Sequence, residues 1–195
     1  MAQAKSRFSS SSRGFTLIEV VIALGLLTVV SLGVAQLFAA STRANYVARG
    51  NTSTTALAEQ KIEQIRSLTW GFDLEGLGLP VSDTTTNLSV QPPAANGSGL
   101  NPTPADSLES NVAGCYEFLD AYGTWVGNGG TAPGTAMFVR RWAIRPLPTN
   151  PNNTLIIQVL VSPLANEAAR QATSAPRVRM AGDALITTIK TRKAS

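Results

Sequence analysis

The stretch Arg-Gly-Phe-Thr-Leu-Ile-Glu-Val-Val-Ile-Ala-Leu, at residues 13–24, decides how the rest of the chain is interpreted. An apolar run begins at Phe15 and extends to Ala40, which is long enough to span a bilayer as a helix. A short leader with three basic residues and no acid precedes this run. Glu19 lies inside the run, where an acid costs roughly 2.5–3.5 kcal/mol near the centre of a membrane span. Because of this cost, the carboxylate of Glu19 is expected to have a functional role.

The segment Gly-Phe-Thr-Leu-Ile-Glu, at residues 14–19, strongly resembles the processing site of type IV prepilins and type II secretion pseudopilins. The resemblance implies that Gly14 is the last leader residue and that Phe15 becomes an N-methylated N-terminus. It also implies that Glu19 docks against a neighbouring subunit. The implied partners are the prepilin peptidase, which is also the N-methyltransferase, other pilin or pseudopilin subunits, and an inner-membrane assembly platform with its ATPase.

The basic residues near the apolar run predict its orientation in a membrane. The leader charges lie just before the run, and no charge follows Glu19 until Arg43. Positive flanks stay cytoplasmic, so we expect a single-pass protein of the bacterial inner membrane with a periplasmic head, which contacts lipid before it enters a filament. The alternative is a secretory signal cleaved near Ala39-Ala40-Ser41. The length of the run and the acid at position 19 disfavour that alternative.

The helical pattern continues beyond the apolar run. Ala58, Ile62, Ile65 and Thr69 fall on one helical face, and Glu63 with Arg66 forms an i,i+3 pair away from it. We therefore divide the chain into four parts. These are a leader (1–14), a transmembrane or filament-core helix (15–40), an amphipathic helix that continues into the head (41–69), and a loop-rich antiparallel β head (70–195).

The remainder of the chain predicts a sheet. Residues 71–114 are rich in Gly, Pro, Ser, Thr and Asn, which indicates a long irregular loop with a short helical turn from Asp106. Residues 164–173 predict a short helix. Strands are predicted at Cys115–Leu119, Thr124–Val126, Ala136–Arg145, Leu155–Val161 and Ala184–Thr191, the first two as a hairpin. The fold class is therefore α+β, with a long N-terminal helix packed against an antiparallel sheet.

The composition excludes several kinds of active site. The sequence contains no histidine, which removes Ser-His-Asp triads, Cys-His pairs and His-ligated zinc. Cys115 is the only cysteine, so no intramolecular disulfide forms, and we expect a buried apolar thiol in place of a reactive one. We predict that the chain is not an enzyme and holds no metal or cofactor.

Charges are segregated along the head. Residues 70–133 contain seven acids and no Lys or Arg, whereas residues 134–195 contain nine bases and two acids. The two parts could neutralise each other within one head, dock between subunits, or leave the basic part free for an anionic partner. The residues of a possible site for DNA or another polyanion are Arg140, Arg141, Arg145, Lys190, Arg192 and Lys193. Trp142 could stack a base there, or could lie in the core.

Two further segments refine the resemblance. Ala-Glu-Gln-Lys-Ile-Glu-Gln-Ile-Arg at 58–66 and Phe-Val-Arg-Arg-Trp-Ala-Ile at 138–144 look like minor pilins of the PilV type and GspI-type pseudopilins. A single cysteine cannot make the C-terminal disulfide loop that major pilins often carry. The resemblance therefore implies a minor, structural subunit of a type IV pilus or a type II secretion pseudopilus. The alternative is a filament-borne subunit that binds DNA or another polyanion through its basic C-terminal third.

Overall fold

The computed structural model describes residues 14–73, 77–173 and 179–193, and the leader predicted at 1–14 lies outside these ranges except for Gly14. The chain divides into two compact units, Met1–Asn45 and Tyr46–Ser195. We call the second the head unit. The fold is α+β, as predicted, with one long N-terminal helix and an antiparallel sheet.

Helix α1 spans Leu17–Ser67, close to the predicted 15–69. Its C-terminal end is rich in strong helix formers such as Ala, Glu, Gln, Lys and Arg, and Trp70 then begins a strand. Within the head unit the helix buries one face, as the spacing predicts. Its buried residues are Thr54, Ala58, Lys61, Ile62 and Ile65. Thr69, predicted to lie on the same face, instead lies beyond the helix and is exposed.

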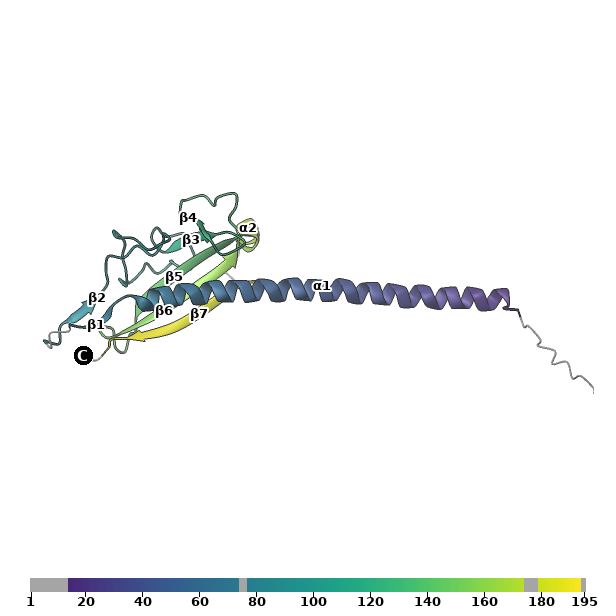
Figure 1. Ribbon diagram of the computed structural model, residues 1–195, viewed down its shortest axis with the longest axis horizontal. Helices are drawn as coiled ribbons and strands as arrows, with labels where there is room; N and C mark the ends of the chain where they lie inside the picture. The colour runs from purple at the N-terminus through teal and green to yellow at the C-terminus, as the bar shows by residue number, and fades with distance from the viewer. Residues whose placement is uncertain (1–13, 74–76, 174–178, 194–195) are drawn as a thin grey trace, which may run out of the picture. The chain divides into compact units, whose positions relative to one another are not determined.

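The main sheet has five strands in the order β4-β3-β5-β6-β7, and every neighbouring pair is antiparallel. All five predicted strands and the short helix are found within a few residues of their predicted bounds. The elements are β3 (Tyr116–Leu119), β4 (Trp125–Gly127), β5 (Phe138–Pro146), β6 (Thr154–Pro163), α2 (Leu164–Thr173) and β7 (Ala184–Thr191). Figure 1 shows β5, β6 and β7 alongside the C-terminal part of α1.

A second, two-stranded sheet was not predicted. Strands β1 (Trp70–Phe72) and β2 (Pro80–Ser82) pair within the segment expected to be a loop. Their three-residue length gives almost no periodic pattern, so the sequence offers little signal for them. The segment after Asp106 forms hydrogen-bonded turns, with the Ser110 N–H donating to the Asp106 carbonyl oxygen, and no helix.

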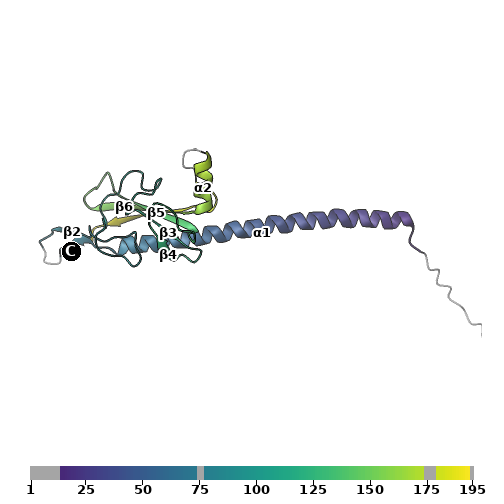
Figure 2. The same cartoon turned by 90° about the horizontal axis from the view of Figure 1, so that it is seen from above.

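Both faces of the main sheet are covered. Adjacent residues of a strand point to opposite faces, and Arg140 contacts α1 whereas Arg141 contacts α2. Helices α1 and α2 therefore lie on opposite faces, as Figure 2 also shows. This explains why six consecutive residues of β5, from Val139 to Ile144, are buried.

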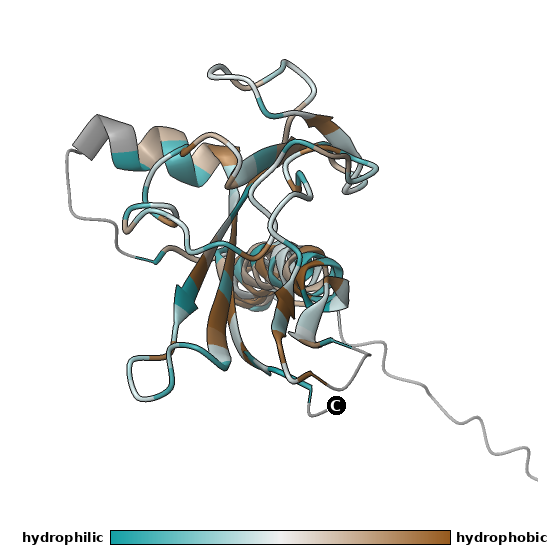
Figure 3. Ribbon diagram, turned by 90° about the vertical axis from the view of Figure 1, so that its left-hand side faces the viewer, coloured by the Kyte–Doolittle hydropathy of each residue, from teal (hydrophilic) through white to brown (hydrophobic). Residues whose placement is uncertain are grey.

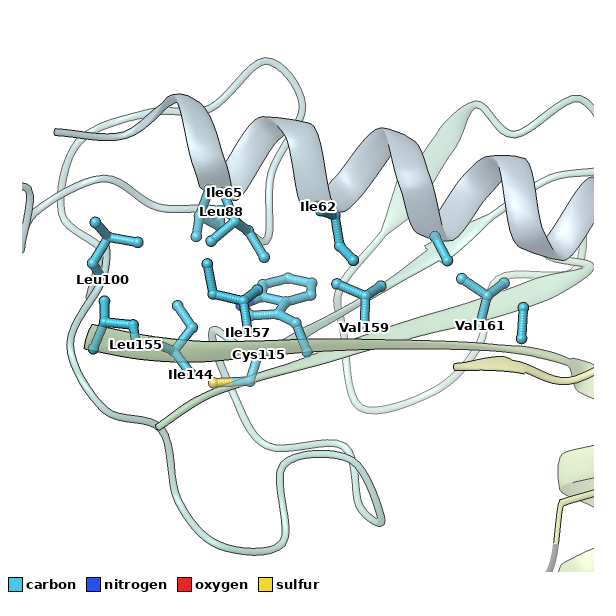
Figure 4. Close-up of a cluster of buried hydrophobic side chains, with 13 residues drawn as sticks. Ile62, Ile65, Leu88, Leu100, Cys115, Ile144, Leu155, Ile157, Val159 and Val161 are labelled. Atoms are coloured by element: carbon cyan, nitrogen blue, oxygen red, sulfur yellow. The ribbon is translucent and has the colours of Figure 1, made fainter. Parts of the chain in front are cut away.

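The main core lies between α1 and the sheet. Figure 4 shows Ile62 and Ile65 of the helix directed toward Ile157 and Val159 of β6, with Cys115 at the edge of the cluster. Cys115 is a buried free thiol, as predicted, and burial raises its pKa. In Figure 3 the strands beside the helix carry hydrophobic stretches, while α2 alternates between hydrophilic and hydrophobic residues. This is the pattern of a surface helix on a packed sheet.

Candidate functional site

The predicted cleavage site is open. Gly14, Phe15 and Thr16 precede the first helical residue, and the Phe15 side chain is 82% exposed. A Cβ placed on Gly14 would meet no atom within 4 Å. Within the described residues nothing requires glycine at this position. A requirement for glycine would instead come from a second protein that approaches the backbone closely.

Thr16 caps the start of α1. The N–H of Glu19 donates to the Thr16 carbonyl oxygen (3.1 Å) and to its hydroxyl oxygen (3.3 Å). Thr16 and Glu19 thus have the spacing of a capping box, and the acid lies in the first turn, where the helix dipole favours a negative charge. The Glu19 side chain is exposed, and in the described part of the chain it forms no ion pair. Its carboxylate is therefore available to a cation on another molecule.

The apolar run that follows is exposed throughout. Every residue from Leu17 to Arg49 is exposed, including Ile22, Leu27 and Phe38. Among the described residues, this part of α1 is the one stretch long and apolar enough to cross a membrane. An apolar surface of this extent needs lipid or other apolar helices around it. A core helix of a soluble protein would bury such a stretch, whereas none of it is buried here.

Comparison with known protein families identifies this region. Residues 9–35 match the family described as the prokaryotic N-terminal methylation motif. The chain carries this methylation motif. It supports a type IV pilin-like subunit that is processed by prepilin peptidase, anchored by one apolar helix and assembled with other pilin subunits. No curated protein and no solved structure matches the chain.

The structure places two of the predicted polyanion-binding residues inside the head. Arg140 is buried, with its Nε 2.7 Å from Glu117 Oε1, and its Nη1 donates to the Leu57 carbonyl oxygen of α1 (2.7 Å). Lys61 Nζ lies 2.8 Å from the same Glu117 oxygen. Lys61 and Arg140 are both buried. Their contacts with Glu117 link α1, β5 and β3.

Arg141 belongs to a second network on the opposite face of the sheet. Its Nη2 lies 3.0 Å from Glu167 Oε2, and its Nε donates to Asn111 (2.9 Å). Glu167 also pairs with Arg170, which in turn contacts Asp183. Trp142, which follows Arg140 and Arg141 in the sequence, is 1% exposed and lies in the core. The side chains at 140–142 are therefore not available for binding at the surface.

The other predicted residues lie nearer the surface. Arg145 donates to the Ala105 carbonyl oxygen (2.6 Å), and Lys190 donates to the Arg66 carbonyl oxygen near the end of α1. Burial lowers the pKa of Lys190, assisted by the positive charges of Arg66 and Lys193. Arg192 stacks on the Trp70 ring at 3.7 Å and donates to the Gly71 carbonyl oxygen (3.0 Å), so it ties β1 to the end of β7.

The predicted neutralisation between the acidic and basic parts occurs in one ion pair of the described residues. Glu117 pairs with Arg140 across the two parts, whereas the bases Arg141 and Arg170 pair with acids of their own part. Glu63 pairs with Arg66 on the helix surface, as predicted.

The ion pair between Lys61 and Glu117 was not predicted from the sequence. A signal for both was present. Lys61 follows Ala58 by three residues and precedes Ile65 by four, which places it on the buried face of the helix. Glu117 interrupts the apolar strand Cys-Tyr-Glu-Phe-Leu. Opposite charges in two elements that are both expected to be buried indicate an internal ion pair.

Proposed function

We propose that this chain is a minor pilin or pseudopilin, a structural subunit that prepilin peptidase processes and that then enters a type IV pilus or a type II secretion pseudopilus. The methylation motif at residues 9–35 carries the proposal. The open Gly14–Phe15 bond supports it, as do the exposed Glu19 side chain and the exposed apolar surface of the helix that follows. The head would be periplasmic, because the positive leader stays in the cytoplasm.

In this proposal Glu19 acts as a register device. An unpaired carboxylate among apolar helices is costly, and a neighbour's N-terminal amine would offset that cost. The subunit would then insert where a neighbouring amine meets Glu19. The chain itself supplies no catalysis in this process, and the peptidase provides the reactive groups.

The mass of the N-terminal peptide, from protein in its native cell envelope, tests the proposal. A peptide that begins with methylated Phe15 is expected. A peptide beginning at Met1, or near Ser41, would show a plain anchored or secreted protein and would overturn the proposal.

Two glycine-to-valine substitutions test whether processing depends on Gly14 itself. Gly14→Val places a branched side chain where the peptidase approaches the backbone, and we expect processing to be lost. Gly25→Val is the matched control, because a Cβ at Gly25 also meets no atom within 4 Å. Normal trimming of the Gly14→Val protein at Phe15 would contradict the assignment of the motif.

The alternative, a polyanion-binding subunit, finds less support. Arg140 and Arg141 are buried in ion pairs, which leaves Arg145, Lys190, Arg192 and Lys193. Salt-sensitive binding of DNA to the detergent-solubilised protein would support it, since phosphate contacts weaken as salt rises. Absence of binding at low salt would remove it.

A further inference from the structure

The buried cluster around Glu117 contains more positive than negative charge. Lys61 and Arg140 both contact Oε1 of Glu117, at 2.8 Å and 2.7 Å, and Lys61 and Glu117 are fully buried. The second carboxylate oxygen, Oε2, is buried and has no hydrogen-bond partner. Two cations therefore share one oxygen of one anion. The cluster therefore carries one net positive charge, and burying an uncompensated charge is unfavourable.

Lys61 is the group that can lose this excess charge. Its Nζ lies 4.1 Å from the centre of the Trp142 ring and donates to the Leu88 carbonyl oxygen. Burial lowers the pKa of Lys61 to about 8, against the opposing attraction of Glu117. Arginine stays protonated in proteins, so Arg140 cannot release the charge instead. Within the described residues the charged groups facing Lys61 are Glu117 from β3 and Arg140 from β5.

The same contacts attach a loop segment to the head. Residues 87–91, which we call the bracing segment, contact α1 and β4. Lys61 binds the Leu88 carbonyl oxygen, and Gln64 of α1 donates to Gln91 (3.2 Å). From the β4 side, Trp125 donates to the Ser89 carbonyl oxygen (2.9 Å). Leu88 itself is buried in the core. Opening this segment would expose Lys61 to water.

We propose that Lys61, Glu117 and Arg140 form a proton-operated latch, in which loss of the Lys61 proton tightens the packing of the bracing segment and of α1 against the sheet. The proposal concerns the head unit alone and does not depend on processing or on filament assembly.

The direction of the effect follows from linkage. Lys61 exposed to water has an ordinary pKa of 10.5, and the closed head lowers that pKa to about 8. Below pH 8 Lys61 is protonated in both the open and the closed head, so the free energy of closing does not change with pH. Between pH 8 and 10.5 the open state binds more protons than the closed one, so closing becomes more favourable as pH rises. The shift corresponds to a change on the order of a hundredfold in the opening equilibrium.

Lysine NMR of the full-length protein in detergent tests the proposal directly. The chain has four lysines, at positions 5, 61, 190 and 193, so ¹³Cε signals can be assigned by substitution. We expect one lysine to titrate near pH 8, with that signal absent in Lys61→Met and retained in Lys190→Met. Titration of Lys61 above pH 10 would overturn the proposal.

A second variant covers the case in which Lys61→Met does not fold. Glu117→Gln keeps the shape of the side chain and removes the charge that holds the proton on Lys61, so the midpoint of Lys61 should fall below that of the wild-type protein. An unchanged midpoint would overturn the electrostatic coupling. Urea unfolding, followed by tryptophan fluorescence, adds the energetic readout. Between pH 7 and 10.5 the unfolding constant of the wild type should fall by about a hundredfold relative to Lys61→Met. Parallel pH profiles would contradict the latch.

Discussion

The two halves of α1 have the same secondary structure and opposite surroundings. Residues 17–45 are mostly apolar, with Glu19 and Arg43 as the charged exceptions, yet every one of them is exposed. Residues 46–67 contain five charged side chains and bury a full face, including Lys61. Among the described residues, the apolar half is therefore exposed, whereas the charged half packs within the head unit.

This difference shows where each half finds its stabilisation. The second half is held by its own head, through Ile62 and Ile65 in the core and through Arg140, which donates to the Leu57 carbonyl oxygen. The first half has the surface of a buried element whose neighbours are lipid or other subunits. Substitutions in the first half should therefore alter membrane insertion and assembly, and substitutions in the second half should alter the stability of the head. Four predictions test this division, from the largest effect to the smallest.

Glu19→Ala should separate processing from assembly. The cleavage site remains intact, so trimming at Phe15 should be normal. Incorporation into filaments should fall by about tenfold or more, since losing one partner of a buried charge pair costs about 2–5 kcal/mol. The measurement is the fraction of processed subunit in sheared filaments. Glu59→Ala, which removes an exposed carboxylate from the second half, is the matched control. Equal incorporation of both variants would contradict a docking role for Glu19.

Glu117→Ala should destabilise the head by about 3–5 kcal/mol, because it leaves Lys61 and Arg140 buried without an anion. Urea unfolding of the detergent-solubilised protein measures the change. Glu109→Ala removes an exposed carboxylate from the preceding loop and should change the free energy of unfolding by less than about 0.5 kcal/mol. Similar losses in both variants would show that the ion pair does not hold the helix to the sheet.

Ile65→Ala and Leu27→Ala compare an apolar side chain in the second half of α1 with one in the first half. Ile65 is fully buried in the core, and its truncation should cost about 2–4 kcal/mol of unfolding free energy. Leu27→Ala removes a similar side chain from the exposed half and should leave unfolding of the head within about 0.5 kcal/mol of wild type. A comparable loss from Leu27→Ala would show that residues 17–45 stabilise the head and would break the division.

The elements predicted best from sequence are those with long, regular patterns. The apolar run and the Val/Ile/Leu-rich β6 are continuous apolar stretches, and Ala58, Ile62 and Ile65 recur with helical spacing; all three elements are found. The motif at residues 14–19 is a local signal that needs no tertiary information, which is why the candidate site could be located without a structure.

The features that were missed depend on tertiary contacts. Strands β1 and β2 are too short for a periodic pattern, and Arg192, which lies 111 residues after Val81, donates to a carbonyl oxygen of each strand. Arg140 and Arg141 were candidates for binding because a basic segment is usually solvated. Their burial requires that α1 and α2 cover both faces of β5, which depends on the whole topology and on the partners Glu117 and Glu167.

Gly123→Ala should produce the smallest effect and tests how closely the β3–β4 hairpin fits over the second half of α1. Gly123 has a φ of +81°, and a Cβ there would lie 2.5 Å from Leu57 Cδ2 of the helix. The positive φ costs a non-glycine residue about 1–2 kcal/mol, while the leucine methyl group can move aside by a rotamer change. We therefore expect a loss of about 1–2 kcal/mol in unfolding free energy. Gly129→Ala, at a position with open space and no positive φ, is the control. A neutral Gly123→Ala would show that the hairpin can shift away from the helix, so that the second half of α1 is held by the sheet and the buried charges alone.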